Sequence, residues 1–414
     1  MSKSRAAIWA ASLVLGLGMA VAVNPAAAQD KGKSKGPSIS KGIVKPIQAA
    51  QAAIKGNKWS ECVSQLRQAD ATPNKTGYDD HAISELLGFC AIRTNDYSTA
   101  AKALETGLNS GFLDKDQVPS RIRALAQVNY QIKNYGKAVE FGRKAVSGGF
   151  ADADMYILVA QAYYIQNDYK TTQKFVGDWV DDLEKRGQTP RENALQLLLS
   201  SCLKLDDNAC VTHSLERLVA GYPKDEYWQN LMSSMFRSGG NDKAMVNVYR
   251  LATEVNAMRR PEDYTEMAQL AIEAGVPGEA QAALETAFSR KVFTDQRDID
   301  KNNRLLATAK TQAATDKTTL ARQDKDAAAA KTGDSDVKLG QAYLSYGQLP
   351  QALTTIQRGI AKGGLKNPAE AQLLLGIAQL KSGNKSEAVK SFKAVKGDEV
   401  LTRLGKLWAI HAAQ

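Results

Sequence analysis

The sequence predicts an all-α fold, a solenoid of stacked antiparallel helix pairs. The main observation is a pattern that occurs twice near the C-terminus, 36 residues apart. It consists of Gly340, Ala342, Leu344, Gly347, Ala352 and Ile356 in the first copy, and of Gly376, Ala378, Leu380, Gly383, Ala388 and Phe392 in the second. A repeat of this length is typical of a supersecondary unit that buries its apolar face by stacking on a neighbour. The second observation is that apolar residues follow helical spacing along most of the chain.

Each copy predicts two helices joined by a turn. In the first copy, apolar residues between 339 and 346 have the spacing of one helix face. Gly347 follows, and glycine accepts the left-handed conformation with which many helices end. Pro350 lies where the second helix is expected to start, and its missing N–H group is tolerated there. We expect Gly340 to face Ala352 across the pair, because small side chains let two helices approach closely.

This pattern resembles the tetratricopeptide repeat. The matching residues are Leu339, Gly340, Tyr343, Ala352 and Ile356 in the first copy, and Leu375, Gly376, Ala388 and Phe392 in the second. Gln379 stands in the place of the tyrosine in the second copy. Because the period is 36 residues here and ~34 in the family, the pattern also resembles the Sel1-like repeat, a longer relative with the same fold.

The resemblance implies an α-solenoid in which small residues let the two helices of each pair approach closely. Weaker copies of the pattern occur through most of the chain before the two clear ones. The small residues at the expected helix contacts are Gly88, Ala100, Ala126, Ala138, Ala244, Ala280, Gly340, Ala352, Gly376 and Ala388.

The N-terminus predicts export. Lys3 and Arg5 precede an apolar core, and small residues end at Ala28, which is typical of a secretory signal peptide over residues 1–28, cleaved after Ala28. An uncleaved N-terminal anchor is the alternative. Residues 29–42 have little apolar content and predict a flexible basic leader. The signal is of bacterial type, so we expect the periplasm.

The remainder of the chain divides into four parts. Residues 43–289 form an N-terminal array of repeats, and residues 336–396 form the C-terminal pair. Residues 290–335, rich in Ala, Lys and Asp, interrupt the pattern and predict a degenerate helical connector, the most mobile part of the chain. A disordered linker is the alternative. Residues 397–414 predict a capping helix with one apolar and one polar face.

Charge and hydropathy limit the class of partner. The formal charge is +10 for the whole chain, and +8 once Lys3 and Arg5 leave with the signal peptide. Positive and negative residues are interspersed, without the concentrated basic stripe that a nucleic-acid partner requires. After residue 28 no apolar run is long enough to predict stable membrane insertion. The expected partner is therefore a protein or peptide of the cell envelope.

Four cysteines, an even number, occur in the exported part of the chain. Cys202 and Cys210 flank an expected turn, whereas Cys62 and Cys90 lie on helices of neighbouring units. We predict these two pairs as disulfides, because an oxidising compartment allows them. Four cysteines permit three pairings, and buried free thiols are the alternative.

The sequence contains no motif that indicates catalysis. It has no phosphate-binding loop, no HExxH and no GxSxG. The cysteines form no CxxC, and the three histidines form no ligand motif, so no metal site and no cofactor is predicted. We therefore expect a protein that is not an enzyme.

The family resemblance implies that the first helix of each unit lines a binding groove. The residues that it places there are Arg93, Arg123, Gln127, Tyr130, Asp154, Gln161, Tyr164, Gln196, Lys204, Gln229 and Arg237. Gln, Tyr and Arg suit adaptable recognition of a peptide. The predicted function is a non-catalytic periplasmic scaffold that binds an extended peptide or a helix of an envelope protein. The alternative is a module that binds peptidoglycan or another envelope polysaccharide, which the aromatic residues and the basic charge also suit.

Overall fold

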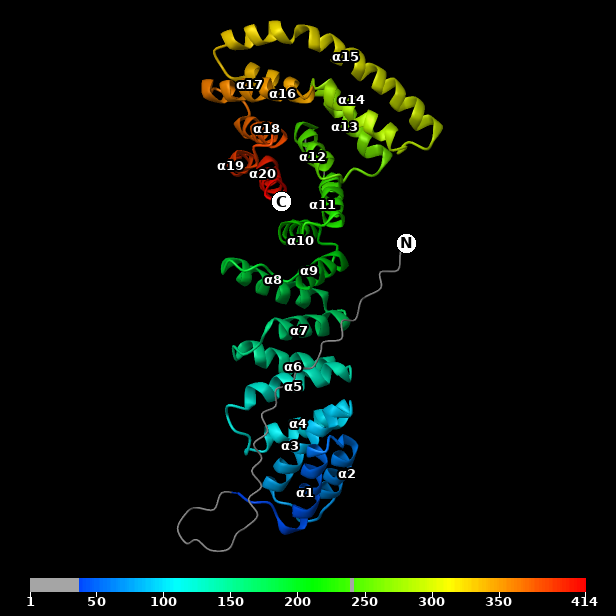
Figure 1. Ribbon diagram of the computed structural model, residues 1–414, viewed down its shortest axis with the longest axis vertical. Helices are drawn as coiled ribbons and strands as arrows, with labels where there is room; N and C mark the ends of the chain where they lie inside the picture. The colour runs from blue at the N-terminus through cyan, green and yellow to red at the C-terminus, as the bar shows by residue number, and fades with distance from the viewer. Residues whose placement is uncertain (1–36, 239–241) are drawn as a thin grey trace. The chain divides into compact units, whose positions relative to one another are not determined.

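The computed structural model describes residues 37–238 and 242–414, and all regular structure within these residues is helical (Figure 1). The predicted signal peptide and residues 29–36 of the predicted leader lie outside the described residues. The chain forms two compact units, unit 1 up to Arg186 and unit 2 over Gly187–Gln414. The predicted all-α solenoid class is confirmed.

Unit 1 consists of four antiparallel helix pairs that stack in chain order. Its helices are α1 (Lys41–Lys55), α2 (Trp59–Asp70), α3 (Gly77–Arg93), α4 (Tyr97–Asn109), α5 (Val118–Gln131), α6 (Tyr135–Ser147), α7 (Ala153–Ile165) and α8 (Tyr169–Lys185). Helix α1 begins two residues inside the predicted leader, and Pro46 lies within it.

Unit 2 contains five pairs, one long helix and a final helix. Its helices are α9 (Glu192–Lys204), α10 (Asn208–Gly221), α11 (Asp225–Ser238), α12 (Asp242–Glu254), α13 (Pro261–Glu273), α14 (Pro277–Ser289), α15 (Gln296–Ala329), α16 (Asp334–Ser345), α17 (Leu349–Lys362), α18 (Pro368–Lys381), α19 (Lys385–Lys393) and α20 (Glu399–Ala412).

The turn inside most pairs has one conformation. The second residue after the first helix has a positive φ, which is supplied by Gly347 and Gly383 in the two clear repeats. Asn95 and Asn167 occupy this place in earlier pairs, since asparagine tolerates the left-handed region better than most residues. The next residue caps the second helix in several pairs, as Asp96 and Asp168 do by accepting backbone N–H groups. This turn chemistry, shared by glycine and asparagine, sets the register of each pair.

Lys133 occupies the same place with φ 62°, a strained conformation for a long side chain. We predict that Lys133→Gly raises the free energy of unfolding of unit 1 by about 1 kcal/mol, because glycine adopts this backbone freely. Urea unfolding followed by circular dichroism measures the change. Asn57→Gly, at φ 54°, is the matched control and is expected to change the free energy of unfolding by only ~0.3 kcal/mol. A destabilised Lys133→Gly would show that the backbone is not strained there.

The ten predicted packing residues are all buried. The expected contact of Gly340 with Ala352 is not the closest one. A side chain at Gly340 would collide with Ile356, and one at Gly376 would lie 2.5 Å from the ring of Phe392. In each repeat the glycine therefore accommodates the apolar residue one turn beyond the alanine.

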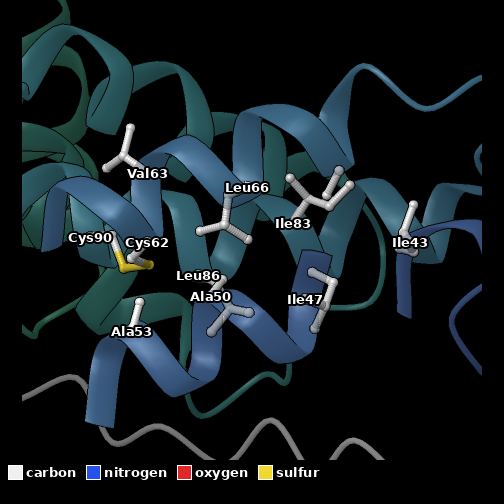
Figure 2. Close-up of a cluster of buried hydrophobic side chains, with 11 residues drawn as sticks. Ile43, Ile47, Ala50, Ala53, Cys62, Val63, Leu66, Ile83, Leu86 and Cys90 are labelled. Atoms are coloured by element: carbon white, nitrogen blue, oxygen red, sulfur yellow. A yellow bond between two sulfur atoms is a disulfide. The ribbon is translucent and has the colours of Figure 1, made fainter. Parts of the chain in front are cut away.

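The hydrophobic core of the first pairs includes a disulfide. Cys62 on α2 and Cys90 on α3 are fully buried and bonded to each other, which links the first pair to the second. Figure 2 shows the sulfur atoms at one end of this cluster and Ile43 at the other. Cys202 and Cys210 form the second disulfide, across the turn between α9 and α10. Both pairs are those that the sequence predicts.

The predicted connector is mainly the single helix α15, 34 residues long. Its buried residues form a thin stripe, with Ala309, Ala313 and Leu320 at helical spacing. It packs on α14 and α16, and Asp316 accepts a hydrogen bond of 2.7 Å from the hydroxyl of Tyr346. The segment is thus a helix packed on the repeats at both of its ends.

Helix α20, the predicted cap, packs on more than the last pair. Its apolar face contacts α18 and α19, as expected for a cap, but it also contacts α10 and α12. Arg403 of α20 forms an ion pair with Glu216 on α10. Lys381 on α18 pairs with Glu254 on α12 at 3.0 Å. Unit 2 therefore closes on itself, which the repeat pattern does not predict.

Candidate functional site

Two neighbouring first helices of unit 1, α5 and α7, carry the same pair of side chains. Gln127 and Tyr130 on α5 correspond to Gln161 and Tyr164 on α7, each displaced by 34 residues. All four side chains are half-buried. The hydroxyl group of Tyr130 donates a hydrogen bond of 3.2 Å to Oε1 of Gln161, which connects the two helices. These four residues form what we call the tyrosine–glutamine face.

The two tyrosines of this face have matching surroundings. Tyr130 packs edge-to-face against Tyr135 at 5.5 Å between ring centroids, and Tyr164 packs in the same way against Tyr169 at 5.1 Å. Burial raises the pKa of both hydroxyl groups, and the adjacent tyrosine raises it further. Both phenols therefore stay protonated at neutral pH and can donate a hydrogen bond, as Tyr130 does to Gln161. The second ring of each pair fixes the first without removing it from the surface.

Arg93, also predicted for the groove, lies in a separate aromatic cluster. Its guanidinium group is 5.3 Å from the ring of Phe89 and 5.6 Å from the ring of Trp59. The two rings themselves meet edge-to-face at 5.7 Å. Cation–π contacts of this kind hold an exposed arginine in a defined direction.

Arg123 and Asp154 are the other predicted residues of unit 1. Arg123 faces Asp152 at 3.8 Å, a distance at which a partly exposed pair contributes little. Asp154 is exposed in the first turn of α7. The structure therefore brings together Tyr130 and Gln161 within the predicted set, with Gln127 and Tyr164 at the equivalent positions.

Four predicted residues belong to unit 2. Gln196 on α9 donates a hydrogen bond of 2.7 Å to the hydroxyl of Tyr227 on α11. Tyr227 in turn donates to Glu192, and burial together with this carboxylate raises the pKa of Tyr227 to about 12. Lys204 is exposed at the end of α9, and on α11 Gln229 is half-buried whereas Arg237 is exposed. Gln196 thus belongs to a polar network with Tyr227 and Glu192.

Several residues of these surfaces are not among those that the sequence predicts. Tyr135 and Tyr169 begin the second helix of their pairs, directly after the capping residue. Their shared place after the turn is a signal that the sequence carries, because Trp59 and Tyr97 occupy it as well. A cavity in unit 2 was also missed, and it has no signal in the repeat pattern.

The described residues contain no group of three or more His, Cys, Asp or Glu side chains placed to hold a metal ion. Within residues 37–238 and 242–414, no helix has both the length and the apolar character of a membrane span.

Known proteins similar to this chain contain tetratricopeptide repeats. Residues 337–399, which contain both copies of the 36-residue pattern, match the tetratricopeptide repeat family. A tetratricopeptide repeat protein from Parabacteroides merdae is 12% identical, with a TM-score of 0.31 over 82% of this chain and 100% of the other. The C-terminal part of a repeat-containing protein from Cytophaga hutchinsonii is 14% identical, with a TM-score of 0.34 over 61% and 98%.

The TPR2AB domain of yeast Sti1, solved as a complex with pHSP90, is 12% identical, with a TM-score of 0.25 over 72% of this chain and 100% of that domain. No curated protein matches the sequence significantly. Tetratricopeptide repeats generally form non-catalytic scaffolds for protein or peptide partners. The family match thus covers residues 337–399, the part of the chain in which the sequence predicts the two clear repeats.

Proposed function

We propose that the chain is a non-catalytic periplasmic scaffold that binds an extended peptide or a helix of a cell-envelope protein on its tyrosine–glutamine face. The observation that carries this proposal is the repetition of one Gln/Tyr pair on α5 and α7, 34 residues apart, with a hydrogen bond between the copies. A repeated pair on adjacent parallel elements offers equivalent contacts to successive parts of an elongated partner.

The chemistry of this face suits a peptide. A glutamine amide offers both a carbonyl acceptor and N–H donors, which match the N–H and C=O groups of a partner backbone. Tyrosine provides a large apolar ring with a polar end, and it is enriched among residues that dominate binding energy. Tyr130 and Tyr164 are half-buried and held by Tyr135 and Tyr169, so little side-chain freedom is lost when a partner binds.

The predicted signal peptide and the disulfides support the cellular part of the proposal. The predicted signal peptide over residues 1–28 would carry the chain out of the cytoplasm. The two disulfides, Cys62–Cys90 and Cys202–Cys210, form and persist in an oxidising compartment. Fractionation of the source cells, with immunodetection of the mature chain, tests this point. Recovery in the cytoplasm with four free thiols would contradict it.

We predict that Tyr130→Ala and Tyr164→Ala each weaken partner binding roughly tenfold, as the truncation of an interface anchor does. The partner is first captured from envelope extract by crosslinking and identified, and its dissociation constant is then measured by titration. Tyr97→Ala is the matched control, because Tyr97 begins a second helix outside the face and donates to Asn95. A partner that binds both variants as tightly as the unaltered chain would contradict this proposal.

An envelope polysaccharide is the second candidate ligand. The Trp59–Phe89 pair with Arg93 over both rings favours it, because partly exposed aromatic rings can stack on sugars and the guanidinium adds positive charge. Sedimentation with purified sacculi distinguishes the candidates. If Trp59→Ala abolishes co-sedimentation and Tyr130→Ala leaves it unchanged, the result favours the polysaccharide as ligand and counts against the peptide.

A further inference from the structure

Unit 2 contains a cavity of about 350 Å³ that its closure creates. The residues around it come from α12, α13, α14, α16, α17, α18 and α20 and from the turns between them. Helix α20 packs on α12, and Lys381 of α18 pairs with Glu254 of α12, so the closure of unit 2 completes the wall. Volumes of this order are at the lower end of those that hold small molecules. The cavity belongs to unit 2 alone and does not depend on the function proposed for the tyrosine–glutamine face.

Much of the wall is apolar. Met258, Met267, Leu344, Ile377 and Trp408 are all buried, and each lines the cavity. Methionine side chains adapt to ligands of irregular shape, and an indole ring offers a broad flat surface. This part of the cavity suits the hydrocarbon body of a ligand.

The charges around the cavity leave one positive charge in excess. Arg250 pairs with Glu279 at 2.9 Å and Lys381 pairs with Glu254 at 3.0 Å. His411 above all, together with Lys381, lowers the pKa of Glu254 to about 2, so this residue is a carboxylate at neutral pH. The remaining cation, Arg290, donates hydrogen bonds to two neutral oxygens of the wall. An anionic ligand would restore neutrality.

Two buried N–H groups of wall residues have no hydrogen-bond partner among the described residues. Arg250 uses Nε for Glu279 and Nη1 for the side chain of Asn247, whereas its Nη2 has no acceptor. The indole Nε1 of Trp408 likewise has no acceptor, and this side chain is 1% exposed. An unpaired buried donor is unfavourable by roughly 1–3 kcal/mol, so such groups in native proteins call for an explanation. A ligand that supplies a hydrogen-bond acceptor would explain both unpaired groups.

We infer that the cavity binds a small monocarboxylic acid with an apolar body. Its carboxylate accepts hydrogen bonds from Arg250 and Trp408 on the side of the cationic residues, and its hydrocarbon part packs against Met258, Met267 and Ile377. This assignment satisfies the two unpartnered donors, the excess positive charge and the apolar wall with one molecule. The donors lie on α12 and α20, which are not the first helices that the family uses for its groove.

Calorimetric titration of the full mature chain with octanoate, 3-phenylpropionate and N-acetyl-leucine tests the inference. We expect saturable binding of at least one of these acids with one site per chain. Octan-1-ol, which keeps the body of octanoate without the charge, is expected to bind at least tenfold more weakly than octanoate wherever octanoate binds. The inference is overturned if none of the three acids binds saturably, or if the alcohol binds as tightly as the acid.

Trp408→Phe removes one N–H donor and keeps an aromatic ring in the core. It is expected to weaken binding of the tightest of the three acids about tenfold, the effect of losing one hydrogen bond to a charged group. Trp228→Phe is the matched control, because both tryptophans contact the ring of His411 and Trp228 does not line the cavity. Equal affinities of the two variants would overturn the inference.

A second variant tests the cavity in case Trp408→Phe fails to fold. Ala283→Leu fills the cavity from α14 without removing a polar group, and it is expected to reduce the binding of that acid in a chain that melts cooperatively. Undiminished binding of that acid to a folded Ala283→Leu chain would place it elsewhere and overturn the inference.

The acid has two sources, a free metabolite or the C-terminus of a polypeptide. An N-acetylated tripeptide that ends in leucine, compared with its C-terminal amide, separates them. Tighter binding of the peptide acid than of the three small acids assigns the cavity to a chain terminus. Tighter binding of a small acid assigns it to a free carboxylic acid.

Discussion

Removal of the Cys62–Cys90 disulfide is expected to lower the free energy of unfolding of unit 1 by about 3–4 kcal/mol. The bond closes a loop with a sequence separation of 28 residues, and the loss of loop-closure entropy in the unfolded chain grows with that length. The Cys202–Cys210 bond spans only 8 residues, so its removal is expected to lower the free energy of unfolding of unit 2 by less, about 2–3 kcal/mol. The loop lengths thus predict which bond matters more.

The measurement compares two double variants, Cys62→Ala/Cys90→Ala and Cys202→Ala/Cys210→Ala. Urea unfolding of each, followed by circular dichroism, gives the change in the free energy of unfolding. A thiol titration of the denatured, unreduced chain is the necessary companion, because it counts the bonds that exist. A count of four free thiols would show that neither disulfide forms. A larger loss from the shorter loop would contradict the entropic argument.

Contacts between neighbouring pairs are predictable from the sequence. In a solenoid each pair packs on the next, so two residues one unit apart are brought together by the period alone. For this reason the repeat pattern is sufficient to pair Cys62 with Cys90, which lie on helices of adjacent pairs. The same argument places Gln127 and Gln161 on equivalent helices.

Contacts between distant repeats are not predictable in this way. Arg403 on α20 pairs with Glu216 on α10 across a sequence separation of 187 residues. Such closure depends on small rotations that accumulate from one pair to the next, and no residue pattern encodes their sum. The cavity of unit 2 depends on this closure, so the sequence does not identify its residues as a set.

Details of side-chain packing are also beyond the pattern. Gly340 and Ala352 recur together, which suggests that they touch, yet Ile356 is the residue that needs the space above the glycine. The offset between the two helices of a pair decides which side chain meets the glycine, and it depends on the turn. The left-handed second residue of that turn, Asn95 or Gly347, is recognisable in the sequence only where it is a glycine.

Replacement of Asp336 by asparagine is expected to lower the free energy of unfolding of unit 2 by about 3 kcal/mol, the lower end for breaking a buried ion pair. The carboxylate is 0% exposed and lies 2.5 Å from Nε of Arg358 and 2.7 Å from Nζ of Lys362. Asparagine keeps the shape and removes the charge, so both cations lose their buried counter-ion. The expected loss of free energy of unfolding is no larger than this because Arg358 and Lys362 are 30% and 21% exposed and remain partly solvated.

The same cluster connects α15 to the last repeats. Arg358 also contacts Asp324 on α15 at 2.6 Å. Asp324→Asn is therefore expected to make α15 more sensitive to limited proteolysis. Because Asp324 is 41% exposed, the free energy of unfolding is expected to fall by only about 0.5–1 kcal/mol.

Glu387→Gln is the control for Asp336→Asn, because the pair of Glu387 with Lys390 is exposed and is expected to contribute at most ~0.5 kcal/mol. If Asp336→Asn matched this control in urea unfolding, α16 and α17 would owe their pairing to apolar packing alone. Cleavage within α15 at the same rate in Asp324→Asn and in the unaltered chain would show that its apolar stripe, Ala309 to Leu320, is sufficient to hold it.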